Sequence, residues 1–197
     1  MGDSEPLRPR RAFDGLLASL SVARGDHPLI VSQPIFAIAA IMARDRGQGA
    51  IADALGLDLP SRPGRVDRDR MSIVGTGPGI WLAMEEGADP LWSDRMAARL
   101  AGCASVADQS SGYAVLRLRG TAARELLQRG AFVDLDSSAF GPGSAAVTMI
   151  AHMGVVLWRA DAGSTFDIAI FRSHANSFWS WMIATASAMA MPVLRDS

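Results

Sequence analysis

Short apolar runs recur along most of the chain, and their periodicity predicts strands. Alternation with a period of two marks a strand buried on one face, whereas a continuous apolar run marks a fully buried element. Residues 35–43 are apolar throughout and fit either a buried strand or a short helix. Residues 72–84 fit two strands around the glycine-rich turn 75–79, and residues 106–119 fit a hairpin that turns at 110–112. Further strands are predicted at 29–32, 147–153, 155–160 and 166–171.

Apolar spacing near 3.6 residues predicts four helices. They are expected at 47–55, 90–101, 121–129 and 173–189, with Ser173 as the N-cap of the last one. A glycine follows each of the first three, as is common where helices end. Within the third, Glu125 and Arg129 are spaced for an ion pair. Polar, Pro- and Gly-containing segments at 61–70 and 133–144 are expected to be loops.

The order of these elements decides the fold class. Helices and strands interleave, but the connections are too short and too rich in hairpins for a doubly wound parallel sheet. We therefore predict an α+β fold with a mixed or antiparallel sheet and helices packed on one face. Within the 197 residues, 1–26 are polar and Arg-rich and are expected to form an extended N-terminal arm. Residues 27–197 are expected to form a single α+β domain.

Two surfaces are candidates for contact with a partner. On the strand ending at residue 119, Arg117 and Arg119 share the face opposite the leucines, so they are either solvated or paired with acidic groups of a partner. In the last helix the apolar side chains span an arc of roughly 200°, wider than one sheet can cover. Phe178 is expected in the core, while Trp179 or Trp181 should pack against a partner subunit or another helix of the chain.

Composition and charge exclude several classes of protein. The formal net charge is −1, from 19 basic and 20 acidic residues, which argues against nucleic-acid binding. The chain contains no lysine, so a Walker A or Schiff-base lysine is excluded. The single cysteine, Cys103, excludes an internal disulfide and any C-x-x-C motif, and is expected to be a small buried hydrophobe. No run fits a membrane span or a signal peptide, so we expect a cytoplasmic protein with no membrane partner.

No residue pattern predicts catalysis or metal binding. The histidines at 27, 152 and 174 lack metal-site spacing, and His152 is expected to be partly buried on a strand face. Glu85 and Glu86 should point to opposite faces of a strand and cannot share a proton. The turn at 75–79 follows a strand but precedes another strand, not the helix that a nucleotide phosphate needs. The sequence thus assigns no catalytic, metal-binding or cofactor-binding residue.

Several strings, taken in order, carry a resemblance to a known family. The ordered combination, from Pro28 to Met189, resembles the gamma subunit of heterotetrameric sarcosine oxidase. The strings are GPGIWL at 77–82, DQSSGYAVLRLRG at 108–120, ARELL at 123–127, GAFVDL at 130–135, FGPG at 140–143, Ala151 with His152, and the aromatic residues between 166 and 181.

This resemblance implies a fold similar to the folate-binding domain of glycine-cleavage aminomethyltransferases. It also implies a non-catalytic gamma subunit of an oxidoreductase acting on CH–NH donors. That enzyme oxidatively demethylates sarcosine to glycine and releases the methyl carbon as formaldehyde or passes it to tetrahydrofolate. The implied partners are its alpha, beta and delta subunits. The implied FAD, FMN, NAD and tetrahydrofolate lie in those partner subunits, and this chain would bind no cofactor.

Three alternatives remain open at this point. One is a gamma-type subunit of a related dehydrogenase for another N-methyl amino acid, such as N-methylglutamate. Another is a folate-binding one-carbon protein acting alone. The chain has only four glutamates, which speaks against it, because a carboxylate would be needed to bind the pterin. The last is an interaction module of unrelated function.

Overall fold

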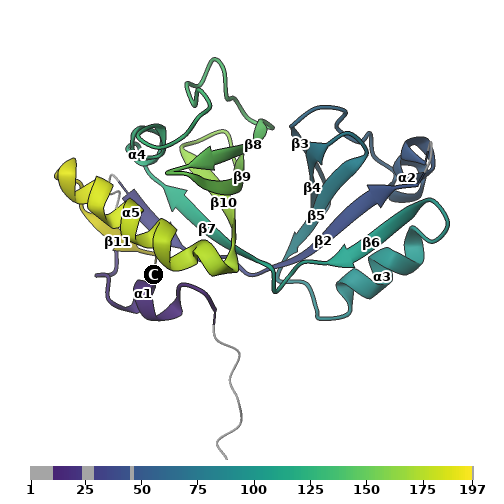
Figure 1. Ribbon diagram of the computed structural model, residues 1–197, viewed down its shortest axis with the longest axis horizontal. Coiled ribbons are helices and arrows are strands. Elements are labelled where there is room, and N and C mark those ends of the chain that lie inside the picture. Colours follow the sequence, from purple (N-terminus) through teal and green to yellow (C-terminus); the bar gives the residue numbers. More distant parts are fainter. Residues whose placement is uncertain (1–10, 24–28, 45–46, 197) are drawn as a thin grey trace, which may run out of the picture.

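The chain forms two β-sheets whose inner faces pack against each other (Figure 1). The computed structural model describes residues 11–23, 29–44 and 47–196. The six-stranded sheet has the order β11-β1-β7-β10-β9-β8, and the five-stranded sheet the order β3-β4-β5-β2-β6. The α+β class is confirmed, with two sheets in place of the one that was expected.

The six-stranded sheet consists of β1 (Leu29–Ser32), β7 (Tyr113–Arg119), β8 (Ala145–Ile150), β9 (Met153–Arg159), β10 (Thr165–Phe171) and β11 (Val193–Arg195). The five-stranded sheet consists of β2 (Phe36–Ala43), β3 (Arg65–Arg68), β4 (Met71–Gly77), β5 (Ile80–Glu86) and β6 (Ala104–Asp108). Neighbouring strands of the described sheets are antiparallel except β1 and β11, which run parallel.

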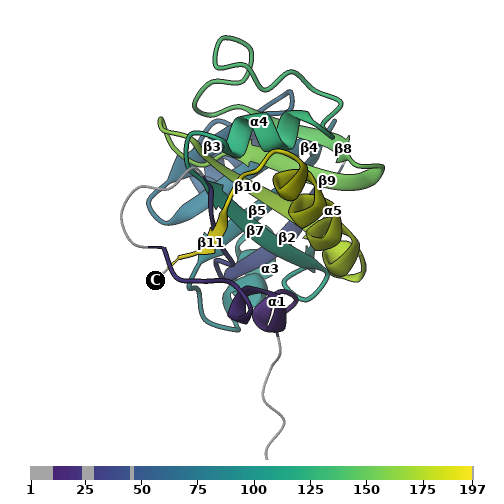
Figure 2. The ribbon, with the colours of Figure 1, turned by 90° about the vertical axis from the view of Figure 1, so that its left-hand side faces the viewer.

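Helices cover the outer face of each sheet, so the molecule has four layers (Figures 1 and 2). On the six-stranded sheet lie α1 (Asp14–Ala18), α4 (Ala123–Gln128) and α5 (Ala175–Ala188). On the five-stranded sheet lie α2 (Gln48–Leu55) and α3 (Trp92–Arg99). A third apolar cluster, which includes Trp158 and Met84, fills the space between the two sheets.

The hairpin predicted at 106–119 does not form. β6 pairs with β2 in one sheet, whereas β7 pairs with β1 and β10 in the other. The chain crosses between the sheets at the predicted turn, where Gln109 N donates to Ile38 O at 2.7 Å and Ile38 N donates to Ser110 Oγ at 3.0 Å. Both strands have the period of two, and that period does not say which partner each strand takes.

Other local predictions are confirmed or corrected by the pairing. Residues 36–43 form a strand, and β4 and β5 form the predicted hairpin, in which Gly79 has a φ of 69° that favours glycine. The predicted loop at 61–70 contains β3, a polar strand at the sheet edge, where charged residues are common. The short strand β11 was not predicted.

His152 lies in a turn and not on a strand face. Ile150 pairs with Met153, so Ala151 and His152 form a two-residue turn between β8 and β9 with φ values of 49° and 64°. Asn or Gly usually occupies such positions, and their absence hid the turn from sequence analysis. The His152 side chain is exposed, with its ring centre 6.0 Å from that of Phe132.

The last helix is confirmed with a shifted start. A 3₁₀ turn at Arg172–His174 precedes α5, and His174 occupies the N-cap position without a side-chain hydrogen bond. The predicted N-cap, Ser173, lies one residue earlier. Phe178 is fully buried in the core of the six-stranded sheet, as predicted.

The described part of the N-terminal arm folds back onto the domain. Phe13 is fully buried, with its ring centre 6.0 Å from that of Trp179, and Val22 forms a parallel bridge with Arg195. This segment therefore contributes to the core of the six-stranded sheet. The division into residues 1–26 and 27–197 stays a prediction. In the described ranges, no helix has both the length and the apolar character that crossing a membrane requires.

Candidate functional site

The four predicted interface residues lie on opposite faces of the six-stranded sheet. Arg117 and Arg119 extend from β7 on the face that carries Val115, which belongs to the cluster between the sheets. Trp179 and Trp181 lie on α5, which covers the outer face. The structure therefore does not bring the two pairs together into one site.

Arg117 is the centre of a charged network that links the two sheets. Its Nε donates to Asp167 Oδ1 at 2.7 Å and its Nη2 donates to Asp167 Oδ2 at 2.8 Å. The same Nη2 reaches Glu86 Oε2 on β5 at 3.2 Å. Asp167 lies directly across from Arg117 in the pairing of β7 with β10. Because a bidentate contact uses the planar geometry of the guanidinium, this pair fixes the register of two strands as well as neutralising charge.

Burial makes Asp167 depend on Arg117. The Asp167 side chain is 1% exposed, and that burial raises the pKa of its carboxyl above the usual range, while the contact with Arg117 offsets part of the rise. The hydrogen bonds to Asp167 raise the pKa of Arg117. The network is therefore a structural ion pair whose acidic partners come from the chain itself.

Arg119 also has an acidic partner in the chain, but at the surface. Its Nη2 lies 2.5 Å from Oδ1 of Asp196, and both side chains are more than a third exposed. Exposed pairs of this kind stabilise a fold by 1 kcal/mol or less, roughly. The role of Arg117 and Arg119 at a subunit interface stays a prediction.

Both tryptophans pack against residues of their own chain. Trp179 is 7% exposed and is covered by Phe13 from the N-terminal segment. Trp181 is half-buried beside Phe178, with ring centres 5.4 Å apart, and it packs on Gly130 after α4. Two segments of the same chain, around Phe13 and Gly130, therefore pack against α5. An interface role for Trp179 and Trp181 stays a prediction.

The remaining chemical candidates have structural partners. Glu85 accepts a hydrogen bond from Trp92 Nε1 at 2.9 Å, whereas Glu86 faces Arg117, so the two carboxylates point to opposite faces as predicted. Cys103 is partly buried, and its Sγ lies 3.3 Å from Leu100 O. Among the residues that the structure describes, no three His, Cys, Asp or Glu side chains lie together as metal ligands would.

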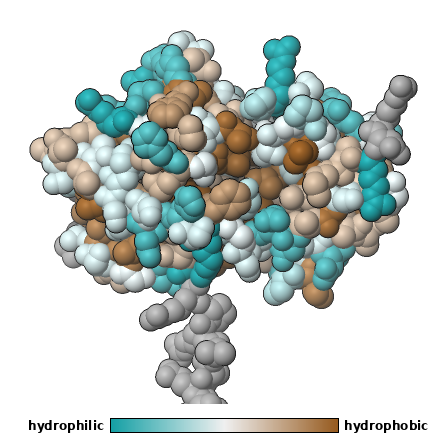
Figure 3. Space-filling view, in the orientation of Figure 1, coloured by the Kyte–Doolittle hydropathy of each residue, from teal (hydrophilic) through white to brown (hydrophobic). Residues whose placement is uncertain are grey.

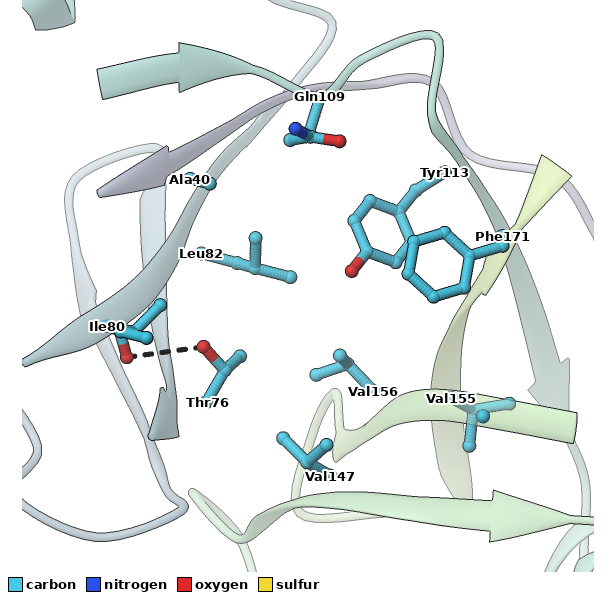
Figure 4. A pocket seen from close by; sticks show the side chains of 11 residues that line it. Ala40, Thr76, Ile80, Leu82, Gln109, Tyr113, Val147, Val155, Val156 and Phe171 are labelled. Atoms are coloured by element: carbon cyan, nitrogen blue, oxygen red, sulfur yellow. Dashed lines mark hydrogen bonds between the residues drawn. The ribbon is translucent and has the colours of Figure 1, made fainter. Parts of the chain in front are cut away.

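A cavity opens between the two sheets, and sequence analysis did not predict it. Its volume is about 380 Å³, and both sheets contribute to its walls (Figure 4). Tyr113 and Phe171 stack at 4.8 Å on one side, and Leu82 and Ile80 face them from the other sheet (Figure 4). Partial burial raises the pKa of the Tyr113 hydroxyl, which points into the cavity. The walls come from strands of both sheets, so only their packing reveals the cavity.

None of the described side chains in the cavity walls is charged. Their polar groups are the Tyr113 hydroxyl, the Gln109 amide and the Thr76 hydroxyl, which already donates to Ile80 O at 3.2 Å. Such a surface accepts neutral, mostly apolar groups, because an ion placed here would lose its hydration without gaining a partner.

The fold is similar to those of two solved structures. A chain of the heterotetrameric sarcosine oxidase from Corynebacterium sp. U-96, solved in complex with pyrrole 2-carboxylate, matches with a TM-score of 0.81 and 26% identity, over 92% of this chain and 96% of that chain. The glycine cleavage system aminomethyltransferase T from Bartonella henselae matches with a TM-score of 0.62 and 12% identity, over 87% of this chain and 48% of that chain, and shows the fold alone.

One of the two sequence comparisons, that with protein families, points to the same family. No curated protein gives a significant sequence match. Residues 41–189, which include β3 to β6 and the end of β2 in the five-stranded sheet and β7 to β10 in the six-stranded one, match the family described as sarcosine oxidase, gamma subunit. The chain therefore belongs to the sarcosine oxidase gamma subunit family.

Proposed function

We propose that this chain is the non-catalytic gamma subunit of a heterotetrameric sarcosine oxidase. It would support the oxidative demethylation of sarcosine to glycine, a reaction of oxidoreductases that act on CH–NH donors. The observation that carries the proposal is the match over 92% of this chain and 96% of a chain of such an enzyme, at a TM-score of 0.81. A match of nearly equal extent on both sides supports a role as a whole subunit.

The ion pairs formed by two carboxylates with shifted pKa values support the non-catalytic role. Carboxylates with shifted pKa values occur where acids and bases act, but also in structural ion pairs. Here Asp89 binds Arg95, which lowers the pKa of the Asp89 carboxyl to about 2, and Asp167 binds Arg117. Both of these carboxylates are therefore held in structural ion pairs.

The proposal assigns the cofactors to the partner subunits. FAD, FMN, NAD and tetrahydrofolate would be held by the alpha and beta subunits, with a delta subunit completing the complex. The glycine-rich turn at 75–79 does not fit a nucleotide, because it joins β4 to β5 and no helix follows it. Gly75 also packs on the chain, since a Cβ there would lie 2.7 Å from Arg62 O. We place the complex in the cytoplasm.

The proposal is tested by purifying the chain alone and recording its visible spectrum. We expect no flavin absorbance and no sarcosine oxidation. The same assays on the chain co-expressed with the alpha, beta and delta subunits should show flavin and activity in one complex. A stoichiometric flavin on the lone chain, or oxidation of sarcosine without the partners, would contradict the non-catalytic role.

A further inference from the structure

Nine large apolar residues are exposed among those that the structure describes, and five of the nine extend from the inner faces of the two sheets. The strand register places them there: Met42 lies opposite Ile80, Val147 opposite Val156, Met149 opposite Gly154, and Phe171 opposite Tyr113. We call Met42, Ile80, Val147, Met149 and Phe171 the inter-sheet face.

This face adjoins the cavity between the sheets. Ile80, Val147 and Phe171 line the cavity, and the space-filling view shows apolar atoms gathered in the hollow between the two halves of the molecule (Figure 3). The sheets pack on each other around Trp158 and Met84, and the five side chains extend the same inner faces beyond that cluster. The inter-sheet face is therefore the uncovered continuation of a buried core.

The size of the face indicates a macromolecular partner. Each of the five side chains is 41–51% exposed. Together they expose roughly 400 Å² of apolar area, a size at which a patch on a monomer is often functional. One side of a standard protein interface buries about 800 Å², so this face would supply about half of one. A small molecule in the cavity would fill the centre but leave the outer side chains uncovered.

The charge of the face defines the chemistry of the partner. None of the described residues that line the cavity is charged. A partner segment that carried a charge into this space would lose hydration without compensation. Apolar or aromatic side chains that enter a pocket at the centre of an interface contribute most of its binding energy.

We propose that the inter-sheet face is the docking surface for another subunit of the oxidase. That subunit presents a neutral segment, inserts an apolar side chain into the cavity, and covers the rim formed by the five side chains. The inference rests on the proposed function, because it takes the occupant to be a subunit of the same complex.

The test is a co-purification of variants of this chain with tagged partner subunits. Val147→Glu places a charge on the face at a side chain that is 51% exposed, and Met149→Glu does so at one that is 42% exposed. The matched control is Leu91→Glu, at a side chain that is 62% exposed before α3 on the outer side of the five-stranded sheet. Thermal melting of each lone variant checks that it folds. We expect both face variants to be retained at least tenfold less than the wild type, and the control to be retained equally.

The outcomes separate the inference from the proposed function. Retention of both face variants at the wild-type level would overturn the docking surface and leave the gamma-subunit assignment standing. Failure of the wild-type chain itself to co-purify would contradict the proposed function, and the docking surface with it. If the lone wild-type chain is a dimer that Val147→Glu dissociates, the face binds a second copy and the inference is wrong.

Discussion

Removing the Arg117 guanidinium should expose how strongly the buried carboxylate depends on it. In Arg117→Met, Asp167, whose side chain is 1% exposed in the wild type, loses both of its hydrogen bonds, at 2.7 and 2.8 Å. Removing one partner of a buried pair costs about 3–5 kcal/mol. We expect the lower value, about 3 kcal/mol, because the Arg117 side chain is 24% exposed and water can reach part of the space it leaves.

The loss should depend on pH in a defined direction. Without Arg117, the pKa of the buried Asp167 carboxyl in the folded state rises further above its unfolded value. The folded variant then binds a proton that the unfolded chain does not, so the variant gains stability as pH falls from 7 towards 4. The deficit relative to the wild type should shrink by up to about 1.4 kcal/mol for each pH unit over which the carboxyl is protonated.

Urea unfolding of the lone chain at pH 7 and pH 5 measures both effects. A loss of about 3 kcal/mol at pH 7 lowers the urea midpoint by about 1–2 M. The matched control is Arg119→Met, whose surface pair with Asp196 should cost 1 kcal/mol or less, roughly. The double variant Arg117→Met with Asp167→Leu should recover most of the loss, because no buried charge is left unpaired and Glu86 is half exposed to water. Equal stabilities of Arg117→Met and Arg119→Met at both pH values would show that the buried Asp167 carboxylate does not depend on Arg117.

Three further changes test other parts of the fold. Phe178→Ala should lower the free energy of unfolding by about 3–5 kcal/mol, measured by urea unfolding, because a fully buried ring leaves a cavity; a loss below 1 kcal/mol, roughly, would contradict its place in the core. Gly130→Ala should cost about 1–3 kcal/mol in the same assay, since its Cβ would lie 2.6 Å from the Trp181 ring; unchanged stability would show that the ring moves away freely. Asp108→Asn should cost about 1 kcal/mol at pH 7. Hydrogen bonds from the Ser110 side chain and backbone lower the pKa of the Asp108 carboxyl in the folded state. The stability that the ionised carboxylate contributes is therefore present above its unfolded pKa and is lost as pH falls through its folded pKa. A stability difference between Asp108→Asn and the wild type that stays constant in thermal melts from pH 6 to pH 3 would argue against this.

Local periodicity predicted the elements but not their assembly. Trp92 and Met96 mark α3, and the glycine-rich turn marks the β4–β5 hairpin, because these signals act within a few residues. β6 and β7 are adjacent in sequence and alternate in the same way, yet they belong to different sheets. Which partner a strand takes depends on the burial of distant faces, and no local pattern carries that information.

The same limit applies to the candidate site. Arg117 was recognised as a charged residue on a strand face, but its partner Asp167 lies 50 residues further along and becomes adjacent only through the register of β7 and β10. Trp179 was expected to pack beyond the sheet, and the residue that covers it, Phe13, comes from a segment that was expected to be an extended arm. The ordered strings of the family resemblance, by contrast, identified the family without any knowledge of the pairing.

As a gamma subunit, this chain should be one part of a larger oxidase. The native mass of the complex obtained when the chain is co-expressed with the alpha, beta and delta subunits tests this. We predict a single assembly that contains one copy of the 20.9 kDa chain and oxidises sarcosine. An assembly of the other subunits that is complete and fully active without this chain, with the chain found separately at 20.9 kDa, would contradict the account.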